Sequence, residues 1–143
     1  MRLNLAVLAI LASLTPARAE PIALRTEPIP SFQNLSGNTT FGALTWRGGL
    51  SLESDSTAFG GLSGLVVADD CNSLVAVSDA GRWFTANLAY DARNHLNAIS
   101  NAKLAPMLDS KGKPPRRKVD ADAEAIAALG KGKYLVGFES RTR

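Results

Sequence analysis

Carboxylates are concentrated in one short stretch, residues 119–129. If this stretch is extended, its side chains alternate between two faces, so Asp120, Asp122 and Glu124 share one face. Glu139 follows after a Gly-containing turn, which would return a further carboxylate to the same region. A row of hard oxygen ligands suits Ca²⁺ or another hard divalent cation. The spacing therefore indicates a carboxylate site for a metal ion.

A helix is the alternative conformation for this acidic stretch. Carboxylates near a helix N-terminus suit the helix dipole, Ala and Glu propagate helices well, and Gly130 would stand just past the last turn. Local propensity alone does not separate this helix from a strand. The decision has to come from the wider pattern of the chain.

An internal repeat favours the strand. Residues 63–82 resemble residues 124–142, with polar turns at 69–72 and 130–132 and a shift of one residue at the turn. Self-similarity at a spacing of about 60 residues is typical of solenoids and propellers. If the first copy begins with a strand, its counterpart from residue 123 to residue 129 should be a strand too.

Short apolar runs separated by turn residues fill the middle of the chain. The runs are residues 41–46, 50–53, 62–68, 74–78, 83–90 and 96–104. Such a pattern predicts an all-β fold built from hairpins. Together with the repeat it predicts a β-propeller with four-stranded blades, of which this chain holds about two. Because propellers close with roughly 4–8 blades, we expect a fragment of a longer propeller, with its remaining blades missing.

Residues 1–19 have the features of a secretory signal peptide. A basic start at Arg2 precedes an apolar run, and the small residues Ala17 and Ala19 lie just before Glu20. An uncleaved membrane anchor is the alternative, but the apolar run is too short to span a bilayer. We expect a secreted or periplasmic protein with an extended lead-in at residues 20–40 and the propeller part at residues 41–143.

The charge balance argues against nucleic-acid binding. Lys and Arg number 16 against 13 Asp and Glu, and loss of Arg2 and Arg18 with the leader would leave 14 basic residues and a net charge of +1. We therefore expect no nucleic-acid partner and no membrane span after cleavage. The single cysteine, Cys71, excludes an intrachain disulfide, and His95 lies in no motif that suggests a Cys/His hydrolase.

A basic loop precedes the acidic stretch, at residues 109–118. Its lysines and arginines could contact an anion or a phosphate group. The alternative is a solvated, mobile connection, which Gly112, Pro114 and Pro115 favour.

Four motifs carry a family resemblance. They are Gly61-Leu-Ser-Gly-Leu65, Val77-Ser-Asp-Ala-Gly81, Asp122-Ala-Glu-Ala-Ile-Ala127 and Leu135-Val-Gly-Phe-Glu139. In this order and spacing they resemble the secreted phytase-like family, also called esterase-like activity of phytase, and more distantly the calcium-dependent β-propeller phytases. The resemblance implies a signal peptide followed by one propeller domain much longer than this chain. Ala125 and Ala80 depart from the family pattern, which usually has Gly at the first position and often Arg or Asp at the second.

The resemblance also implies roles for acidic residues. Asp122 and Glu124 correspond to cation ligands, and Glu139 is a third candidate ligand. Asp79 stands at the equivalent position in the preceding blade, where the alternative role is that of a turn residue before Gly81.

Two arginines follow the loops of the repeat. Arg82 and Arg141 are the candidates to bind substrate and to neutralise charge on a departing group, and the alternative is that both are simply solvent-exposed.

The function expected from these features is hydrolysis of a small phosphoric or other ester with the help of Ca²⁺. A bound Ca²⁺ would polarise a phosphoryl oxygen and orient a water molecule for attack. The alternative is a non-enzymatic propeller that binds a ligand and holds a structural calcium ion, because a fold does not fix a function. A nonfunctional remnant is a third possibility.

Overall fold

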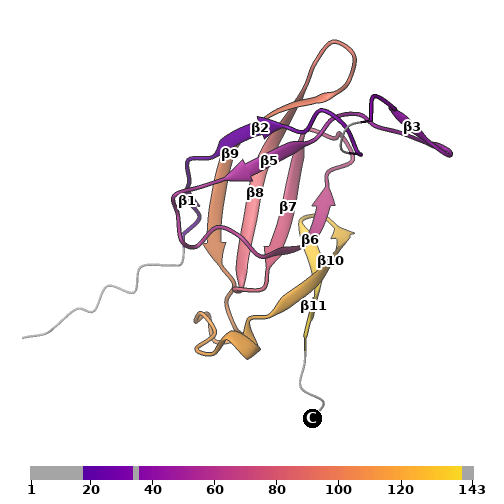
Figure 1. The fold of residues 1–143 in the computed structure, drawn as a ribbon. Coiled ribbons are helices and arrows are strands. Elements are labelled where there is room, and N and C mark those ends of the chain that lie inside the picture. Colours follow the sequence, from indigo (N-terminus) through magenta and orange to yellow (C-terminus); the bar gives the residue numbers. More distant parts are fainter. Residues whose placement is uncertain (1–17, 34–35, 140–143) are drawn as a thin grey trace, which may run out of the picture.

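The computed structural model describes residues 18–33 and 36–139 and has an all-β architecture in this part of the chain (Figure 1). The strands form one five-stranded sheet and three two-stranded sheets, and all pairings are antiparallel. The one helical element in the described ranges is a 3-10 turn, η1 (Lys118–Asp120). The predicted all-β fold class is therefore confirmed.

The five-stranded sheet contains four strands that follow one another along the chain. In spatial order the strands are β1 (Glu20–Pro21), β9 (Leu96–Pro106), β8 (Arg82–Tyr90), β7 (Ser73–Ser78) and β6 (Leu62–Val67). Aspartates stabilise two of the connecting turns. Asp70 accepts the backbone N–H of Asn72 at 2.9 Å, and Asp91 accepts those of Arg93 and His95 at 2.8 Å. The Asx turns explain why these polar residues end the strands.

The three small sheets come from both ends of the described chain. They pair β2 (Arg25–Pro28) with β5 (Leu50–Glu53), β3 (Thr40–Phe41) with β4 (Leu44–Thr45), and β10 (Ala123–Gly130) with β11 (Lys133–Phe138). The strand expected at residues 41–46 is wrong in detail, because Gly42 has a φ of +61° and turns the chain within it. The other predicted strands are present, and β10 shows that the acidic stretch does not continue as a helix.

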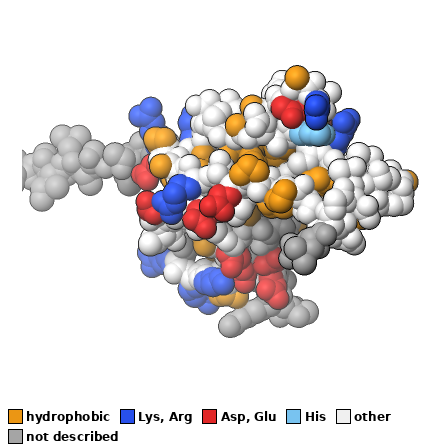
Figure 2. Space-filling model, turned by 45° about the horizontal axis from the view of Figure 1, so that its top comes forward, with side chains coloured by type: hydrophobic (Ala, Val, Ile, Leu, Met, Phe, Trp, Pro, Cys, Tyr) orange, Lys and Arg blue, Asp and Glu red, His pale blue; other side chains and the backbone are white. Residues whose placement is uncertain are grey.

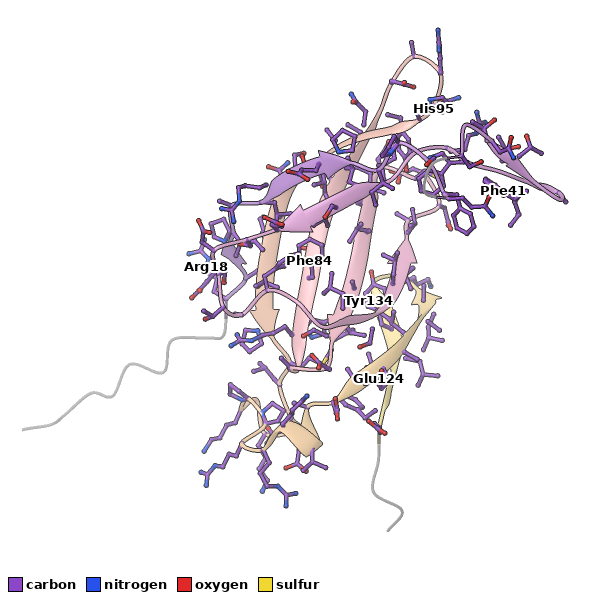
Figure 3. All side chains as sticks on the ribbon, viewed as in Figure 1. Arg18, Phe41, Phe84, His95, Glu124 and Tyr134 are labelled. Carbon is purple, nitrogen blue, oxygen red and sulfur yellow. The ribbon has the colours of Figure 1, made fainter. Side chains whose placement is uncertain are left out.

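One face of the large sheet is covered by the N-terminal segment. The side chains buried on this face are those of Ala76, Phe84, Ala86, Ala102 and Leu104. Phe84 lies near the centre (Figure 3), and Phe59 meets its ring edge-on with the centroids 5.4 Å apart. Ile22 and Leu24 pack on the same cluster. The predicted lead-in is thus part of the packed structure, and β1 and β2 also pair with β9 and β5.

The opposite face of the sheet is covered by the β10–β11 hairpin. Val77 and Ala123 are both 0% exposed, and Met107 is 4% exposed beside them. Trp83 on β8 and Tyr134 on β11 lie with their ring centroids 5.9 Å apart. Successive residues of β7 thus pack into two different cores, Ala76 on one face of the sheet and Val77 on the other. This is expected for a strand that is buried on both sides.

A glycine lets the backbones of β6 and β10 approach closely. A Cβ atom built on Gly64 would lie 2.9 Å from the backbone nitrogen of Ile126 and 3.0 Å from the carbonyl carbon of Ala125. These are backbone atoms, so they cannot rotate away. The position of the hairpin on the sheet therefore depends on Gly64.

Most of the predicted signal peptide, residues 1–17, lies outside the described residues. Among the residues that are described, no helix is long and apolar enough to cross a membrane.

In the view of Figure 2, hydrophobic side chains gather in the middle of the face, and acidic and basic side chains lie around them.

Replacement of Gly64 by Ala should destabilise the protein. The added methyl group would push the backbone of β10 away from β6, and overpacking of this kind costs about 1–3 kcal/mol of unfolding free energy. Urea unfolding followed by tryptophan fluorescence would measure the loss. Gly137→Ala is the matched control, because its Cβ would meet only the Cβ of Ala125 at an ordinary 3.5 Å. Equal unfolding midpoints for the two variants would contradict the close packing of β10 on β6.

Candidate functional site

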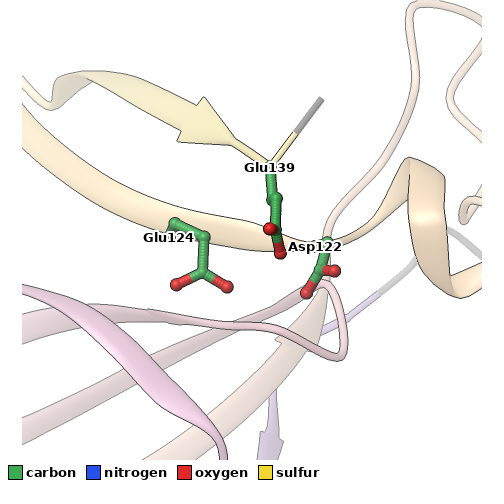
Figure 4. A group of neighbouring side chains, drawn as sticks. All are labelled: Asp122, Glu124 and Glu139. Atoms are coloured by element: carbon green, nitrogen blue, oxygen red, sulfur yellow. The ribbon is translucent and has the colours of Figure 1, made fainter. Parts of the chain in front are cut away.

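Three of the predicted site residues come together where the β10–β11 hairpin begins and ends (Figure 4). We call Asp122, Glu124 and Glu139 the carboxylate group. One carboxylate oxygen from each residue lies within 4.8 Å of those of the other two. Asp122 is half-buried, and Glu124 and Glu139 are exposed. The group is thus open to solvent on one side and supported by the hairpin on the other.

The backbone of the hairpin brings these carboxylates together. The N–H of Glu139 donates a hydrogen bond of 2.8 Å to the carbonyl oxygen of Asp122. Ala123 then pairs with Phe138 and Ala125 with Gly137, so that Glu124 is the extra residue of a β-bulge. A bulge changes the direction in which a side chain points. The hairpin closure and the bulge together explain how residues far apart in sequence form one group.

Asp120 does not join the carboxylate group. The sequence pattern placed Asp120 on one face with Asp122 and Glu124, but alternation requires a continuous strand, and β10 begins only at Ala123. Asp120 lies in η1, where both of its carboxylate oxygens accept hydrogen bonds of 2.7 Å from the guanidinium of Arg117. This part of the prediction is wrong because the 3-10 turn interrupts the extended backbone.

The first repeat has the same backbone arrangement with different side chains. The N–H of Asp79 donates to the carbonyl oxygen of Gly61 at 2.9 Å, as Glu139 does to Asp122. A register shift also falls at Ser63, between the paired residues on either side of it. Gly61, Ser63 and Asp79 therefore stand at the positions that the carboxylate group holds in the second repeat. Only one of these three positions carries a charge.

Asp79 has the role of a turn residue, which was the alternative considered for it, and its role as a ligand stays a prediction. It lies in the turn between β7 and β8, just before Gly81, whose φ is +68°. Its carboxylate packs directly against Gly61, where any Cβ would overlap the oxygen Oδ1. Gly61 also has a φ of +57°, so glycine is favoured there for two independent reasons.

Lys118 connects the two repeats electrostatically. Its ammonium nitrogen Nζ donates to Oδ2 of Asp79 at 3.3 Å. This hydrogen bond first, and then the negative charges of Asp79, Asp122 and Glu124, raise the pKa of Lys118 above its ordinary value. Sequence reasoning did not single out Lys118, and the only signal for it is that the basic run ends directly before the acidic stretch.

The described structure does not bring Arg82, one of the two predicted substrate-binding arginines, into contact with the carboxylate group. Arg82 begins β8, and its backbone N–H donates to the hydroxyl of the buried Ser78 at 3.2 Å. Within residues 18–33 and 36–139 the side chain of Arg82 makes no hydrogen bond or ion pair with the carboxylate group. Arg141 lies outside the described residues.

An open cleft of about 1050 Å³ lies beside the carboxylate group and shares Glu139 with it. The loop from Asp109 to Asp120 forms one wall, and Phe138 and Glu139 form another. The loop begins with a defined turn, in which Oδ1 of Asp109 accepts the N–H groups of Lys113 and Lys111 at 2.9 and 2.8 Å. These bonds, first that from Lys113 and then that from Lys111, lower the pKa of Asp109. We call this space the basic cleft.

The remaining candidates for nucleophilic chemistry lie in turns of the large sheet. Cys71 is exposed in the turn between β6 and β7. His95 faces Asp91 at 3.6 Å in the turn between β8 and β9. Cys71 and His95 make no hydrogen bond with each other in the described structure.

Comparison with known proteins confirms the family resemblance. The model of the phytase-like family, described as esterase-like activity of phytase, matches residues 57–143. The match covers more than half of the chain and includes both repeats, the carboxylate group and the basic cleft. These features define an all-β domain of the phytase type. The chain belongs to the family named for the esterase-like activity of phytase. Searches of curated proteins and of solved structures gave no match.

Asp79→Asn should lower the pKa of Lys118 toward its ordinary value of 10.5, because Asp79 is the main cause of the increase. A lysine whose pKa is higher in the folded than in the unfolded state stabilises the folded protein. This stabilisation is fully present at pH values below the unfolded-state pKa, and it is lost as the pH rises through the folded-state pKa. The variant should therefore be less stable than the wild type at neutral pH, and the difference should shrink in strong alkali. An NMR titration of the lysine Cε signal would measure the pKa.

Glu139→Gln is the control for this titration, because Glu139 is not among the groups that raise the pKa of Lys118. The control should leave the Lys118 titration unchanged. If the two variants shift the titration equally, the Asp79–Lys118 contact does not hold the ammonium.

Proposed function

We propose that the chain is part of a β-propeller in a secreted or periplasmic hydrolase, and that its carboxylate group binds Ca²⁺. The observation that carries the proposal is the convergence of Asp122, Glu124 and Glu139 within a domain of the phytase-like family. The features of residues 1–19 support secretion. Partners expected from this proposal are a small phosphorylated or other ester substrate and further propeller blades.

The arrangement of the strands supports the propeller. Strands β6 to β9 form a four-stranded antiparallel unit, and β10–β11 packs face to face on it like the first half of a second unit. The outer side of this hairpin remains apolar, since Leu129 and Leu135 are 64% and 63% exposed. A further blade stacked on the hairpin would bury these side chains, as β10–β11 buries Val77.

The dimensions of the carboxylate group suit Ca²⁺. Ca²⁺ binds oxygen at about 2.3–2.6 Å, so two ligands on opposite sides of the ion are about 5 Å apart. The observed spread of at most 4.8 Å is within this range without rearrangement. Mg²⁺ binds at about 2.0–2.1 Å with strict octahedral geometry and would require tighter positions.

The chain's own residues would hold the ion and the substrate's charge. Asp122 and Glu139 are fixed relative to each other by the backbone hydrogen bond between them, so little ordering is needed for binding. Lys118 places a positive charge next to the group. When bound, Ca²⁺ would polarise an ester oxygen and orient a water molecule. Arg82 and Arg141 remain predicted substrate-binding residues.

A structural calcium site without catalysis is the second candidate function. Asp122 and Glu139 flank the point where the hairpin closes, so an ion held between them would fasten the end of β11 to the start of β10. In this case the ion would stabilise the fold, and the domain would act as a binding module.

The double variant Asp122→Asn, Glu124→Gln tests the proposed site. In the wild type, Ca²⁺ at 100 times its dissociation constant should add about 2.7 kcal/mol of stability. The variant should lose this gain, which calorimetry and thermal melts would measure together with turnover of p-nitrophenyl phosphate. The control is Asp69→Asn with Glu27→Gln, which makes the same charge change at exposed positions on other elements.

The outcomes separate the candidates. Loss of turnover with retained folding supports the hydrolase. A loss of calcium-dependent stability in a protein that shows no turnover supports the structural site. If Ca²⁺ neither binds to nor stabilises the wild type, the carboxylate group is not a calcium site and the proposal fails.

A further inference from the structure

We infer that Lys111, Lys113 and Arg116 form a binding site for a phosphate group in the basic cleft, and that they make the site selective for anionic over neutral esters. The selectivity rests on the proposed hydrolase function, whereas the binding site itself does not.

Some of the charged groups in and beside the cleft already have partners. Arg117 is held by both carboxylate oxygens of Asp120, and Lys118 is held by Asp79. The carboxylate of Asp109 accepts two backbone N–H groups of its own turn. In contrast, Lys111, Lys113 and Arg116 form no ion pair with any residue of the described chain. Three cations that line one cleft are therefore available to a ligand.

The loop holds these three side chains within a short segment. The turn made by Asp109 fixes the backbone at Lys111 and Lys113 through their N–H groups. Pro114 and Pro115 then restrict the backbone between Lys113 and Arg116, because each proline ring fixes φ. The basic side chains are thus presented by a loop whose backbone is restrained at several points, which lowers the entropic cost of binding.

The chemistry of the cleft suits a phosphate dianion. A phosphate group has three oxygens that accept charge-assisted hydrogen bonds, and both the guanidinium of an arginine and the ammonium of a lysine bind it well. A neutral ester offers no charge to these groups. The cleft therefore favours a ligand with at least two negative charges on neighbouring oxygens.

Glu139 connects the basic cleft to the carboxylate group. It lines the cleft, and it also belongs to the three carboxylates. An anion in the cleft would be repelled by these carboxylates until a cation neutralises them. Binding of phosphate and of Ca²⁺ should therefore be cooperative, and each ligand must increase the affinity of the other by the same factor. A phosphate ester would be bound by the cleft with its phosphorus next to the cation.

The triple variant Lys111→Gln, Lys113→Gln, Arg116→Gln tests this site. Calorimetry with inorganic phosphate in the presence of Ca²⁺ should show affinity at least about tenfold weaker than that of the wild type, since three charge-assisted contacts are removed. The control variant is Lys103→Gln, Lys133→Gln, Arg93→Gln, which removes the same charge from β9, β11 and the β8–β9 turn. The control should bind phosphate as the wild type does.

Turnover of p-nitrophenyl phosphate and of the neutral p-nitrophenyl acetate tests the selectivity. The triple variant should raise the KM for the phosphate ester about tenfold and leave the acetate ester unchanged. Unchanged phosphate affinity in the triple variant, or an equal loss in the control, would overturn the inference. Hydrolysis of only the acetate ester by the wild type would also overturn the inference, whereas the proposal that the protein is a hydrolase would stand. If phosphate binds through these residues and neither ester is hydrolysed, the binding site stands and the hydrolase proposal fails.

Discussion

Burial of Ala123 against Val77 determines where the rest of the candidate site lies. Both residues are fully buried, and Gly64 allows the backbone of β10 to approach β6 closely beside them. Ala121 and Ala123 are buried in the core, whereas Asp122 between them is half-buried and Glu124 is exposed. A larger residue at position 123 would displace the hairpin, and its carboxylates would move with it. The backbone positions of the charged residues thus depend on apolar contacts.

The two repeats show how one backbone supports two different surfaces. Each has a hairpin, a bulge near the start of its first strand and a hydrogen bond that closes its end, from Asp79 to Gly61 or from Glu139 to Asp122. In the first repeat the glycine makes room for a single aspartate, which Lys118 neutralises. In the second repeat three carboxylates lie together. The backbone is shared, and a few side chains decide how much negative charge each copy carries at this place.

Local patterns predicted much of this structure. Short apolar runs between turn residues predicted the strands from β5 to β9, and the repeat predicted β10 as a strand where propensity also allowed a helix. The turn at Gly42 and the 3-10 turn at Asp120 were missed, because each breaks an otherwise regular pattern with a short backbone deviation. The contact between Lys118 and Asp79 spans 39 residues. No periodicity reports such a contact, since it depends on how the hairpin packs on the sheet.

The position of the basic cleft beside the carboxylate group follows from the same packing. The loop that carries the lysines and arginines leads directly into η1 and β10, so the buried Ala121 and Ala123 fix its end against the sheet. Arg117 is paired with Asp120 in the same loop and Lys118 with Asp79 on the large sheet, whereas Lys111, Lys113 and Arg116 line the cleft. Under the proposals above, Ca²⁺ would neutralise the carboxylate group and a phosphate group would neutralise the cations of the cleft. A phosphate ester with Ca²⁺ has this combination of charges.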